Sequence, residues 1–424
     1  MLRTHYVSDV NAGMDGQNVT LAGWIDTIRD VGKIKFIILR DRTGKAQIVV
    51  KDMSMIPENM LRESVISIEG VVSRTKSSKD FSWEILPTVI KMLNPAEAPL
   101  PLDPNVESEL ETRLDNRFLD LRNPKIQAIF RIKDVIQRSF VRYFEDHGFV
   151  LVNVPSIVAA STEGGTDLFH VKYFEKSAYL SQSPQLYKQI MMATGLDKVI
   201  IQTPVFRAEK HNTTRHLNES TQMDIEIAFV EDEQPALHYI KEVVQFIYTA
   251  INRECKPQLE LLGKELHVPR SIKIMTYEES LELLEKNGIK LSFGDDLTPE
   301  AERLLCTIHD PVIITKWPTD IRAFYSMPEP DNPKICRAYD MLLGGAEVLS
   351  GAQRIHKYDE LVKEMKRRKL NPDNFNFYLS AFRYGIPPHA GWSFGLERLT
   401  ANILGLKNIR EAMIFPRDRT RMEP

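Results

Sequence analysis

The sequence has few cysteines and no long apolar run. Its three cysteines, Cys255, Cys306 and Cys336, lie far apart and never form a CxxC pair. An odd number of scattered cysteines argues against a disulfide framework and against a cysteine-based zinc site. The longest stretch without Asp, Glu, Lys or Arg, residues 147–162, is too short and too polar to span a bilayer. Residues 1–10 also lack an apolar signal segment, so we expect a cytoplasmic protein with no membrane partner.

Glycine-rich nucleotide motifs and zinc-hydrolase motifs are also missing. Neither GxxxxGK[ST] nor GxGxxG occurs at a strand-to-helix junction, and HExxH is absent. These absences argue against P-loop enzymes, Rossmann enzymes and the common zinc hydrolases. Residues 391–395 have the GxSxG form of a hydrolase elbow, but that fold needs its catalytic histidine after the serine, and the last histidine is His389. Chain order therefore argues against a serine hydrolase.

The charge of the chain is nearly balanced, with a formal net charge of -3. Bulk charge therefore does not favour general binding to DNA or to anionic membranes. The balance hides a local excess, because residues 28–51 carry seven basic side chains and two acidic ones. Any polyanion partner would therefore be met locally, and a basic segment of this kind would bind it with salt-sensitive affinity.

The order of strand and helix patterns predicts an α+β chain. Residues 19–93 contain short β-branched runs separated by Gly, Asp and Ser, which predicts a small β-barrel. Prolines 95, 99, 101 and 104 then indicate an extended boundary. Apolar residues at helical spacing from Ile126 to Phe144 predict a long helix that ends before Gly148. The rest mixes strands and helices, which predicts a mostly antiparallel sheet flanked by helices. The expected domains are residues 1–100, a linker at 101–124, and residues 125–424.

Four segments of the large domain combine charge and glycine with apolar surroundings. They are residues 182–188, residues 206–229, residues 340–354 and residues 391–399. In the strand at 222–229, a period of two places Met223, Ile225, Ile227 and Phe229 on a core face and Gln222, Asp224 and Glu226 on the other face. Arginines beside such a strand suit a phosphate chain. When a segment is considered by itself, a salt-bridged surface hairpin or a charged helix start explains it equally well.

The ordered motifs in these segments resemble class II aminoacyl-tRNA synthetases of subclass b, and specifically the aspartyl enzymes of archaeal type. Pro155 after the long helix is similar to motif 1, FRAE (206–209) with RHLNESTQMDIEIAF (215–229) to motif 2, and GLERL (395–399) to motif 3. TEGGTDLF (162–169), SPQLYKQ (183–189) and FRYGIPPH (382–389) extend the resemblance over the whole chain. The N-terminal barrel resembles the anticodon-binding OB-fold of that family.

The resemblance implies an ATP-dependent aspartate-tRNA ligase that is a homodimer and uses Mg²⁺. Arg207 and Arg398 would be catalytic through contact with ATP. The ATP-binding residues would be Arg207, Ala208, Glu209, Arg215, His216, Leu217, Glu347, Gly395, Leu396, Glu397 and Arg398. Mg²⁺ would lie at Glu347, Ser350 and Asp340, since it accepts few carboxylates besides water and phosphate. The residues implied for aspartate are Glu163, Gln185, Lys188, Asp224, Ser350 and Arg354.

The charges of two implied binding residues indicate which amino acid is the substrate. Lys188 and Arg354 would hold the side-chain carboxylate of aspartate, and an asparagine amide would leave the ammonium of Lys188 unpaired. Asparaginyl-tRNA synthetase is therefore the less favoured alternative. A synthetase-derived asparagine synthetase would not need the barrel. A non-catalytic tRNA-binding paralogue would be expected to lose the charged site residues, which are all present here.

The barrel would bind the anticodon through Arg29, Phe36 and Gln47, by stacking on one base and reading polar edges. The alternative is that Phe36 is a barrel core residue and Arg29 a turn residue. Discriminating archaeal enzymes typically have Trp and Lys where this chain has Asp26 and Asp80. This difference favours charging of tRNA(Asn) as well as tRNA(Asp), although two carboxylates could also discriminate by repulsion.

Overall fold

The computed structural model describes residues 2–75, 80–159, 168–210 and 213–424. The chain forms two compact units, Met1–Pro101 and Leu102–Pro424. Residues 102–124, which we expected to be linker, belong to the second unit and contain helices α1 (Leu110–Asp115) and α2 (Arg117–Asp120). The buried Arg117 explains this, because its guanidinium donates to the carbonyls of Met413 and Ile414 at 3.0 Å each. These contacts dock the segment on the C-terminal part of the chain.

The first unit is a closed five-stranded barrel with strand order β1-β2-β3-β5-β4. Its strands are β1 (Asn18–Val31), β2 (Ile34–Arg40), β3 (Lys45–Val50), β4 (Val65–Arg74) and β5 (Trp83–Asn94). Each strand contributes at least one buried isoleucine to the interior: Ile25, Ile37, Ile48, Ile66 and Ile85 are examples. Gly32 adopts a positive φ of 68° in the two-residue turn between β1 and β2, as tight hairpins require. The predicted barrel is confirmed.

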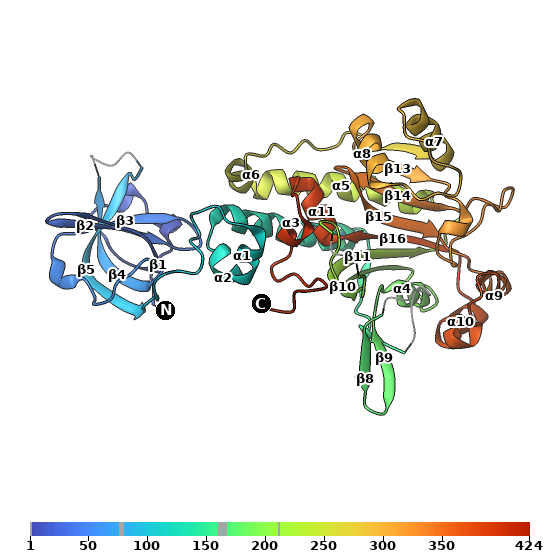
Figure 1. Cartoon of the computed structure of the whole chain (residues 1–424), viewed down its shortest axis with the longest axis horizontal. Coiled ribbons are helices and arrows are strands. Elements are labelled where there is room, and N and C mark those ends of the chain that lie inside the picture. The colour runs from blue at the N-terminus through green and yellow to red at the C-terminus, as the bar shows by residue number, and fades with distance from the viewer. Residues whose placement is uncertain (1, 76–79, 160–167, 211–212) are drawn as a thin grey trace. The chain divides into compact units, whose positions relative to one another are not determined.

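The second unit contains an eight-stranded sheet with the order β12-β13-β14-β15-β16-β11-β10-β6 (Figure 1). Only the β12/β13 and β10/β6 pairs are parallel, so the predicted mostly antiparallel sheet is confirmed. The strands are β6 (Val150–Leu151), β10 (Lys198–Phe206), β11 (Glu219–Ala228), β12 (Lys273–Thr276), β13 (Val312–Thr315), β14 (Ala338–Leu343), β15 (Ala346–Gln353) and β16 (His389–Gly395).

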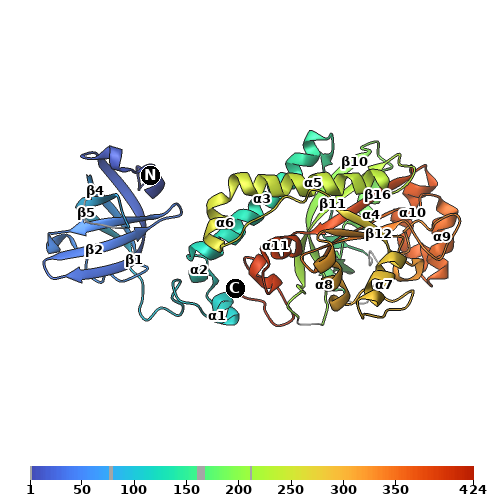
Figure 2. The ribbon, with the colours of Figure 1, turned by 90° about the horizontal axis from the view of Figure 1, so that it is seen from above.

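One face of this sheet is covered by long helices. α3 (Pro124–Asp146) and α5 (Gln234–Glu254) lie side by side, with α6 (Lys256–Leu262) and α11 (Leu396–Leu404) next to α3 (Figure 2). α3 begins at an Asn123 side-chain cap with Pro124 in its first turn, which is the expected start for a helix. Its apolar stripe, including Ile132, Ile136, Phe140 and Phe144, is buried against the sheet, which confirms the predicted helix.

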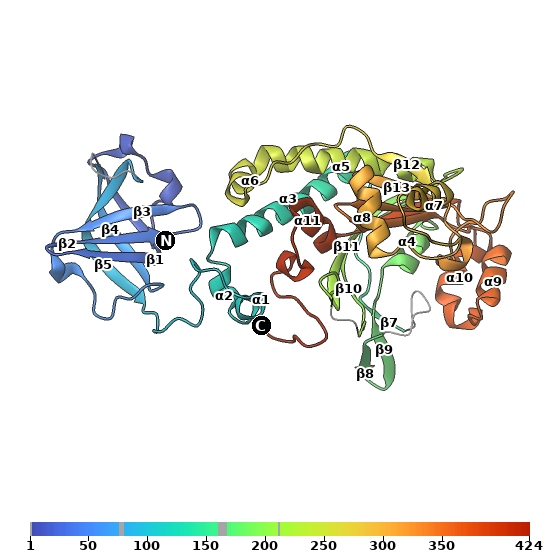
Figure 3. The same cartoon turned by 45° about the horizontal axis from the view of Figure 1, so that its top comes forward.

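Among the described residues, two groups of helices cover the two ends of the opposite face. α7 (Tyr277–Lys286) and α8 (Pro299–Ile308) share one apolar cluster with β13 and β14, while α4 (Gln185–Met191), α9 (Tyr358–Arg367) and α10 (Asn376–Arg383) share another. A small sheet of β7 (Ile157–Val158), β9 (Lys176–Leu180) and β8 (His170–Tyr173) extends away from the main sheet (Figure 3). Short 3₁₀ turns are η1 (Val7–Asp9), η2 (Ala12–Met14), η3 (Met53–Met55), η4 (Thr319–Ile321), η5 (Pro372–Phe375) and η6 (Ile409–Ala412).

The alternation predicted for β11 holds with one exception. Met223, Ile225 and Ile227 are buried in the core between the sheet and the long helices. Phe229 was expected with them, and this prediction is wrong, because its side chain is 76% exposed. β11 ends at Ala228, and Phe229 adopts a positive φ of 60° that breaks the alternation of the strand. Strand periodicity applies only up to the residue where the extended backbone ends.

Candidate active site

A row of polar side chains crosses the middle of the main sheet, between the two helix groups of its second face. Asp224 of β11 is paired with Ser393 of β16, and Ser393 is paired with Ser350 of β15. The Ser393 hydroxyl donates to the Asp224 carboxylate at 3.0 Å. Directly paired residues share one face of a sheet. The sheet register therefore brings the predicted aspartate-binding residue Asp224 to the same face as the predicted metal residue Ser350.

Two adjoining hollows, of about 330 Å³ and about 240 Å³, lie at this row. Both are lined by Arg207, Gln222, Glu347, Ser350 and Ser393. The larger hollow also has the remaining predicted phosphate-side residues Glu209, Arg215, His216, Leu217, Gly395, Glu397 and Arg398. The smaller hollow also has Ser183, Gln185, Asp224, Arg322 and Arg354. The structure thus brings the two predicted sets together, with Arg207 at their junction.

Four buried charges lie behind the smaller hollow. The Lys188 ammonium of α4 is 2.8 Å from Asp224 and 3.5 Å from Glu226, and Arg354 binds Glu226 at 2.9 Å. Burial alone disfavours every one of these charges, yet Arg354 and Lys188 hold the pKa of Glu226 below its ordinary value. Burial raises the pKa of Asp224 in spite of Lys188. We call Lys188, Asp224, Glu226 and Arg354 the charge quartet.

Only part of the charge quartet reaches the hollow. Asp224 and Arg354 line it, whereas Lys188 is 1% exposed and lies behind Asp224. Arg354 donates through Nε and Nη2 to Glu226 and to the Gly391 carbonyl, and no described residue accepts from its Nη1. Gly391 is required for this packing, because a Cβ there would lie 2.1 Å from the Glu226 carboxylate. The glycine therefore makes room for the Glu226 carboxylate.

Arg207 is held at the junction by its backbone. Its N–H donates to the Asn218 carbonyl at 2.9 Å, and the Asn218 amide donates to the carbonyls of Arg207 and Glu209 at 2.7 and 3.1 Å. The Asn218 N–H donates in turn to the Arg417 carbonyl at 2.8 Å. No described residue binds the Arg207 guanidinium, which is therefore available to an anion in the hollow. Sequence reasoning assigned no role to Asn218, because a polar loop residue gives no sign of what it will bind.

The far end of the larger hollow is built around Arg215. Its guanidinium donates to Glu302 of α8 at 2.9 Å and to the Gly345 carbonyl at 3.2 Å. Arg398 donates to the Glu347 carbonyl at 3.1 Å. Burial, together with the negative charge of Glu347, raises the pKa of Glu302. Glu302 is a further residue of this region that the sequence did not indicate, since it lies 87 residues after Arg215 in the chain and only the fold brings the two together.

The predicted metal residues do not all meet. Glu347 and Ser350 line both hollows, but Asp340 is 2% exposed, is ion-paired with Arg322, and lines neither hollow. Within the described ranges no group of three His, Cys, Asp or Glu side chains could hold a metal ion. One carboxylate and one hydroxyl still fit Mg²⁺, which takes most of its ligands from water and phosphate. Asp340 instead neutralises a buried arginine.

Two predicted ATP-binding residues lie away from the hollows, and a third, Glu397, lines the larger hollow but is also bound to two neighbouring elements. Leu396 is 1% exposed within the core, and Ala208 lines neither hollow. Glu397 accepts from the Lys133 ammonium at 2.7 Å and from the Thr221 N–H at 2.8 Å, which fixes α11 against α3 and β11. Glu163 lies outside the described residues.

In the barrel, the three predicted anticodon residues lie on one face. Arg29 is paired with Phe36 across β1 and β2, and Gln47 is paired with Ile38, two residues from Phe36 on the same face of β2. Phe36 is half-buried and outside the apolar core of the barrel, so the alternative of a core residue is wrong. Gln47 donates to Glu84 at 3.0 Å. An aromatic ring between an arginine and an amide suits an unstacked base.

Asp26, expected to act on tRNA choice, is only 4% exposed. It accepts from Arg40 and from Lys45 at 2.7 Å each, and Arg40 also binds Glu63. Although burial acts in the opposite direction, these two cations lower the pKa of Asp26. Asp80 is exposed. Of the two acidic residues, therefore, only Asp80 presents its side chain to solvent.

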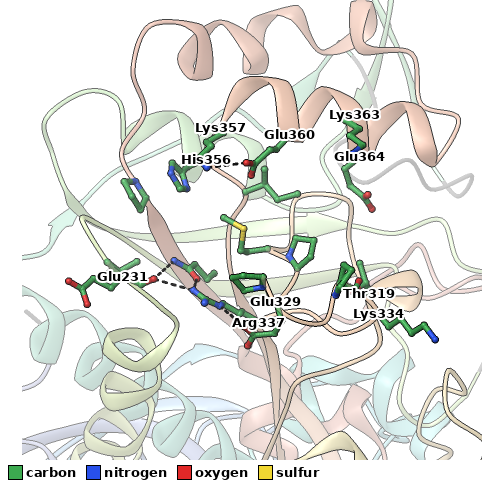
Figure 4. Close-up of a pocket in the computed structure, with 18 of the residues that line it drawn as sticks. Glu231, Thr319, Glu329, Lys334, Arg337, His356, Lys357, Glu360, Lys363 and Glu364 are labelled. Carbon is green, nitrogen blue, oxygen red and sulfur yellow. Dashed lines mark hydrogen bonds and ion pairs between the residues drawn. The ribbon is translucent and has the colours of Figure 1, made fainter.

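A cavity of about 1040 Å³ lies elsewhere in the second unit (Figure 4). Its lining includes Glu231, Arg337, His356, Glu360 and Glu364, with Arg337 bonded to the Glu231 carbonyl. None of the predicted site residues lines it. Both acidic and basic side chains line the cavity, so its charge does not favour a ligand of either sign.

Comparisons with known proteins agree with the division of the chain into two units. The family model described as tRNA synthetases class II (D, K and N) matches residues 109–419, and the model described as OB-fold nucleic acid binding domain matches residues 19–93. The chain is 47% identical to the aspartate-tRNA(Asp/Asn) ligase of Methanocaldococcus jannaschii over 100% of its own length and 98% of the relative's. It is 44% identical to the aspartate-tRNA(Asp) ligase of Pyrococcus furiosus, with 100% of both chains covered.

Solved structures of similar proteins also match the chain over almost its whole length. The asparaginyl-tRNA synthetase of Pyrococcus horikoshii, complexed with asparaginyl-adenylate, matches with a TM-score of 0.94 and 33% identity over 100% of both chains. The aspartyl-tRNA synthetase of Entamoeba histolytica matches with a TM-score of 0.88 and 31% identity over 99% of this chain and 92% of that one. In the part of the chain that the structure describes, no helix is long and apolar enough to cross a membrane.

Proposed function

The chain belongs to the class II tRNA synthetases of the D, K and N group, and on this premise we propose that it activates L-aspartate with ATP and transfers it to tRNA. The predicted family and the predicted aspartate-tRNA ligase activity, an ATP-dependent ligase reaction, are both confirmed. The observation that carries the assignment of substrate is the charge quartet. Arg354 offers a free donor to a carboxylate in the smaller hollow, next to Asp224, which suits an ammonium.

The arrangement supports a direct in-line reaction at phosphorus. The α-carboxylate of aspartate attacks the α-phosphorus of ATP and expels pyrophosphate, which gives aspartyl-adenylate. The 3′-hydroxyl of the tRNA then attacks the carbonyl carbon of the adenylate, forms the ester and releases AMP. Arg207, whose guanidinium is bound by none of the described residues, holds the α-phosphate between the two substrates. Arg215, His216 and Arg398 surround the remainder of ATP. Such positioning and charge neutralisation account for most of the rate of the first step, because the attacking carboxylate has no proton to lose.

Mg²⁺ is held by Glu347 and Ser350 in this proposal, without Asp340. The ion neutralises charge on the phosphates of ATP when it is bound. Glu347 supplies the charged ligand, and its position at both hollows suits an ion shared between ATP and the reacting centre.

We also propose a cytoplasmic homodimer that joins through the motif 1 region. β6 is the last strand of the main sheet, and its side chains Val150 and Leu151 are 43% and 44% exposed. An apolar strand with one open edge invites pairing with a second copy. Light scattering of the purified protein tests this, and Val150→Lys is expected to yield monomers.

For tRNA choice we propose charging of both tRNA(Asp) and tRNA(Asn). The internal pairing of Asp26 supports this, because a neutralised and buried carboxylate does not repel an RNA. Six of the similar relatives carry the name aspartate-tRNA(Asp/Asn) ligase, at 44–47% identity, and two carry the name aspartate-tRNA(Asp) ligase, at 44%.

Two assays test the proposal. Pyrophosphate exchange with ATP is expected with aspartate and not with asparagine; exchange with asparagine alone would favour the asparaginyl enzyme, and exchange with neither would exclude a synthetase. Charging of purified tRNA(Asp) and tRNA(Asn) transcripts with labelled aspartate is expected for both. Charging of tRNA(Asp) alone would exclude the relaxed specificity.

A further inference from the structure

A chain of buried hydrogen bonds lies behind Gln185, away from the hollow. The Gln185 amide donates to Gln189 Oε1 at 3.1 Å, and Gln189 Nε2 lies 3.0 Å from His389 Nε2. His389 Nδ1 lies 2.8 Å from the carbonyl oxygen of Pro387. Gln189 and His389 are 0% exposed and Gln185 is 5% exposed. Water therefore cannot replace any of these partners without rearrangement.

The direction of this chain is set at Pro387. A carbonyl oxygen only accepts, so the hydrogen of the imidazole lies on Nδ1. Burial lowers the pKa of His389 to about 4, so the ring is neutral at pH 7 and its Nε2 can only accept. Gln189 must therefore turn its NH₂ group toward His389 and its carbonyl toward Gln185.

The orientation of the Gln189 amide in turn fixes the orientation of the Gln185 amide. Because Gln189 presents a carbonyl, Gln185 must donate through its own NH₂ group, which leaves its Oε1 as an acceptor. No described residue donates to this oxygen, and Gln185 lines the smaller hollow beside Asp224. The two glutamines are four residues apart on α4, so one helical turn connects the hollow to the buried end of the chain.

We propose that His389 and Gln189 are positioning residues that fix the Gln185 carbonyl as a hydrogen-bond acceptor for the α-ammonium of the amino-acid substrate. This rests on the proposed function, which places that ammonium next to Asp224, in the hollow that Gln185 also lines. If the chain ran in the opposite direction, Gln185 would aim its NH₂ group at the ammonium and repel it. His389 thus acts on specificity through two side chains without touching the substrate.

The test compares L-aspartate with succinate, which is aspartate without its amino group. In Gln189→Met, the KM for aspartate in pyrophosphate exchange is expected to rise roughly ten- to a hundredfold, the range for one hydrogen bond to a charged group. The inhibition constant of succinate and the KM for ATP are expected to stay at their wild-type values. A purely structural defect would weaken both ligands together.

Two further variants make the test specific. His389→Asn keeps a donor for the Pro387 carbonyl but removes the acceptor for Gln189, so it is expected to reproduce the selective loss, and it decides the question if Gln189→Met does not fold. Tyr378→Phe is the matched control: the Tyr378 hydroxyl also contacts Gln189 Oε1, at 3.0 Å, but a rotatable hydroxyl imposes no direction. Its aspartate-to-succinate ratio is expected to match the wild type. Equal losses for both ligands, or no loss in either variant, would overturn the inference, whereas a wild-type protein inactive with aspartate would instead overturn the proposed function.

Discussion

The ammonium of Lys188 lies 2.8 Å from the carboxylate of Asp224, and each side chain is only 1% exposed. Asp224, and not Lys188, forms the wall of the smaller hollow. The lysine therefore acts on a ligand first through the carboxylate that it neutralises. A substrate that brings both an ammonium and a carboxylate can share Asp224 with Lys188 and bind Arg354, without leaving a net buried charge.

Lys188→Leu is expected to abolish activation of aspartate. The substitution leaves two buried carboxylates facing one guanidinium, and breaking a buried pair destabilises by about 3–5 kcal/mol. Aspartate-dependent pyrophosphate exchange and thermal unfolding measure the two effects. Lys286→Leu, at an exposed position of α7, is the control for loss of a lysine. Unchanged kinetics with aspartate would contradict the role of Lys188.

Arg207→Ala is expected to reduce exchange by about a hundredfold or more, because an aligned charge at a developing transition state contributes this much. Folding should not change, since the Asn218 bonds to this residue involve only its backbone. Arg142→Ala, whose side chain is 71% exposed on α3, should leave the exchange rate at its wild-type value. Near wild-type exchange in Arg207→Ala would disprove its place at the α-phosphate.

Phe36→Ala is expected to impair charging of tRNA while sparing exchange. Loss of a stacked base reduces binding roughly ten- to a hundredfold, and activation of aspartate does not need the anticodon. The two assays on the same preparation provide the comparison. An equal fall in both would mean that the substitution damages the fold rather than the RNA contact.

Glu347→Gln is expected to raise the Mg²⁺ concentration needed for half-maximal exchange by about tenfold. The amide keeps the size of the side chain but removes the charge that attracts the ion. Titration of Mg²⁺ at fixed ATP measures the shift. Glu282→Gln, at an exposed position of α7, should titrate like the wild type, and an identical curve for Glu347→Gln would remove this residue from the metal site.

Stability is expected to fall as the pH drops from about 6.5, the ordinary pKa of histidine, toward 4. The folded state keeps His389 neutral, with its pKa lowered to about 4 by burial, so the unfolded chain binds the extra proton. The loss is about 1.4 kcal/mol per pH unit within this window and absent above it. Thermal unfolding between pH 7 and pH 5 should show a shallower slope for His389→Asn than for the wild type. His267→Asn, with an 84% exposed side chain, should keep the wild-type slope.

The fold was predictable where local pattern and packing agree. The apolar stripe of α3 and the strands of the barrel are examples, because their periodicity follows from burial of one face. Patterns could not predict where a strand stops, so Phe229 was misplaced. They also could not show that Asp340 and Asp26 would be neutralised by arginines, because charge partners distant in sequence depend on the fold. Asn218 and Glu302 were missed for the same reason.

The charge quartet also constrains how this sequence can diverge. Replacing any single member leaves a buried charge without its partner, at a cost of about 3–5 kcal/mol, which is a large part of the stability that a protein has to lose. A descendant that came to prefer a different amino acid would therefore have to exchange at least two of the four residues nearly together. Single substitutions made one after another would first give an unstable protein. This loss of stability protects the specificity of the site.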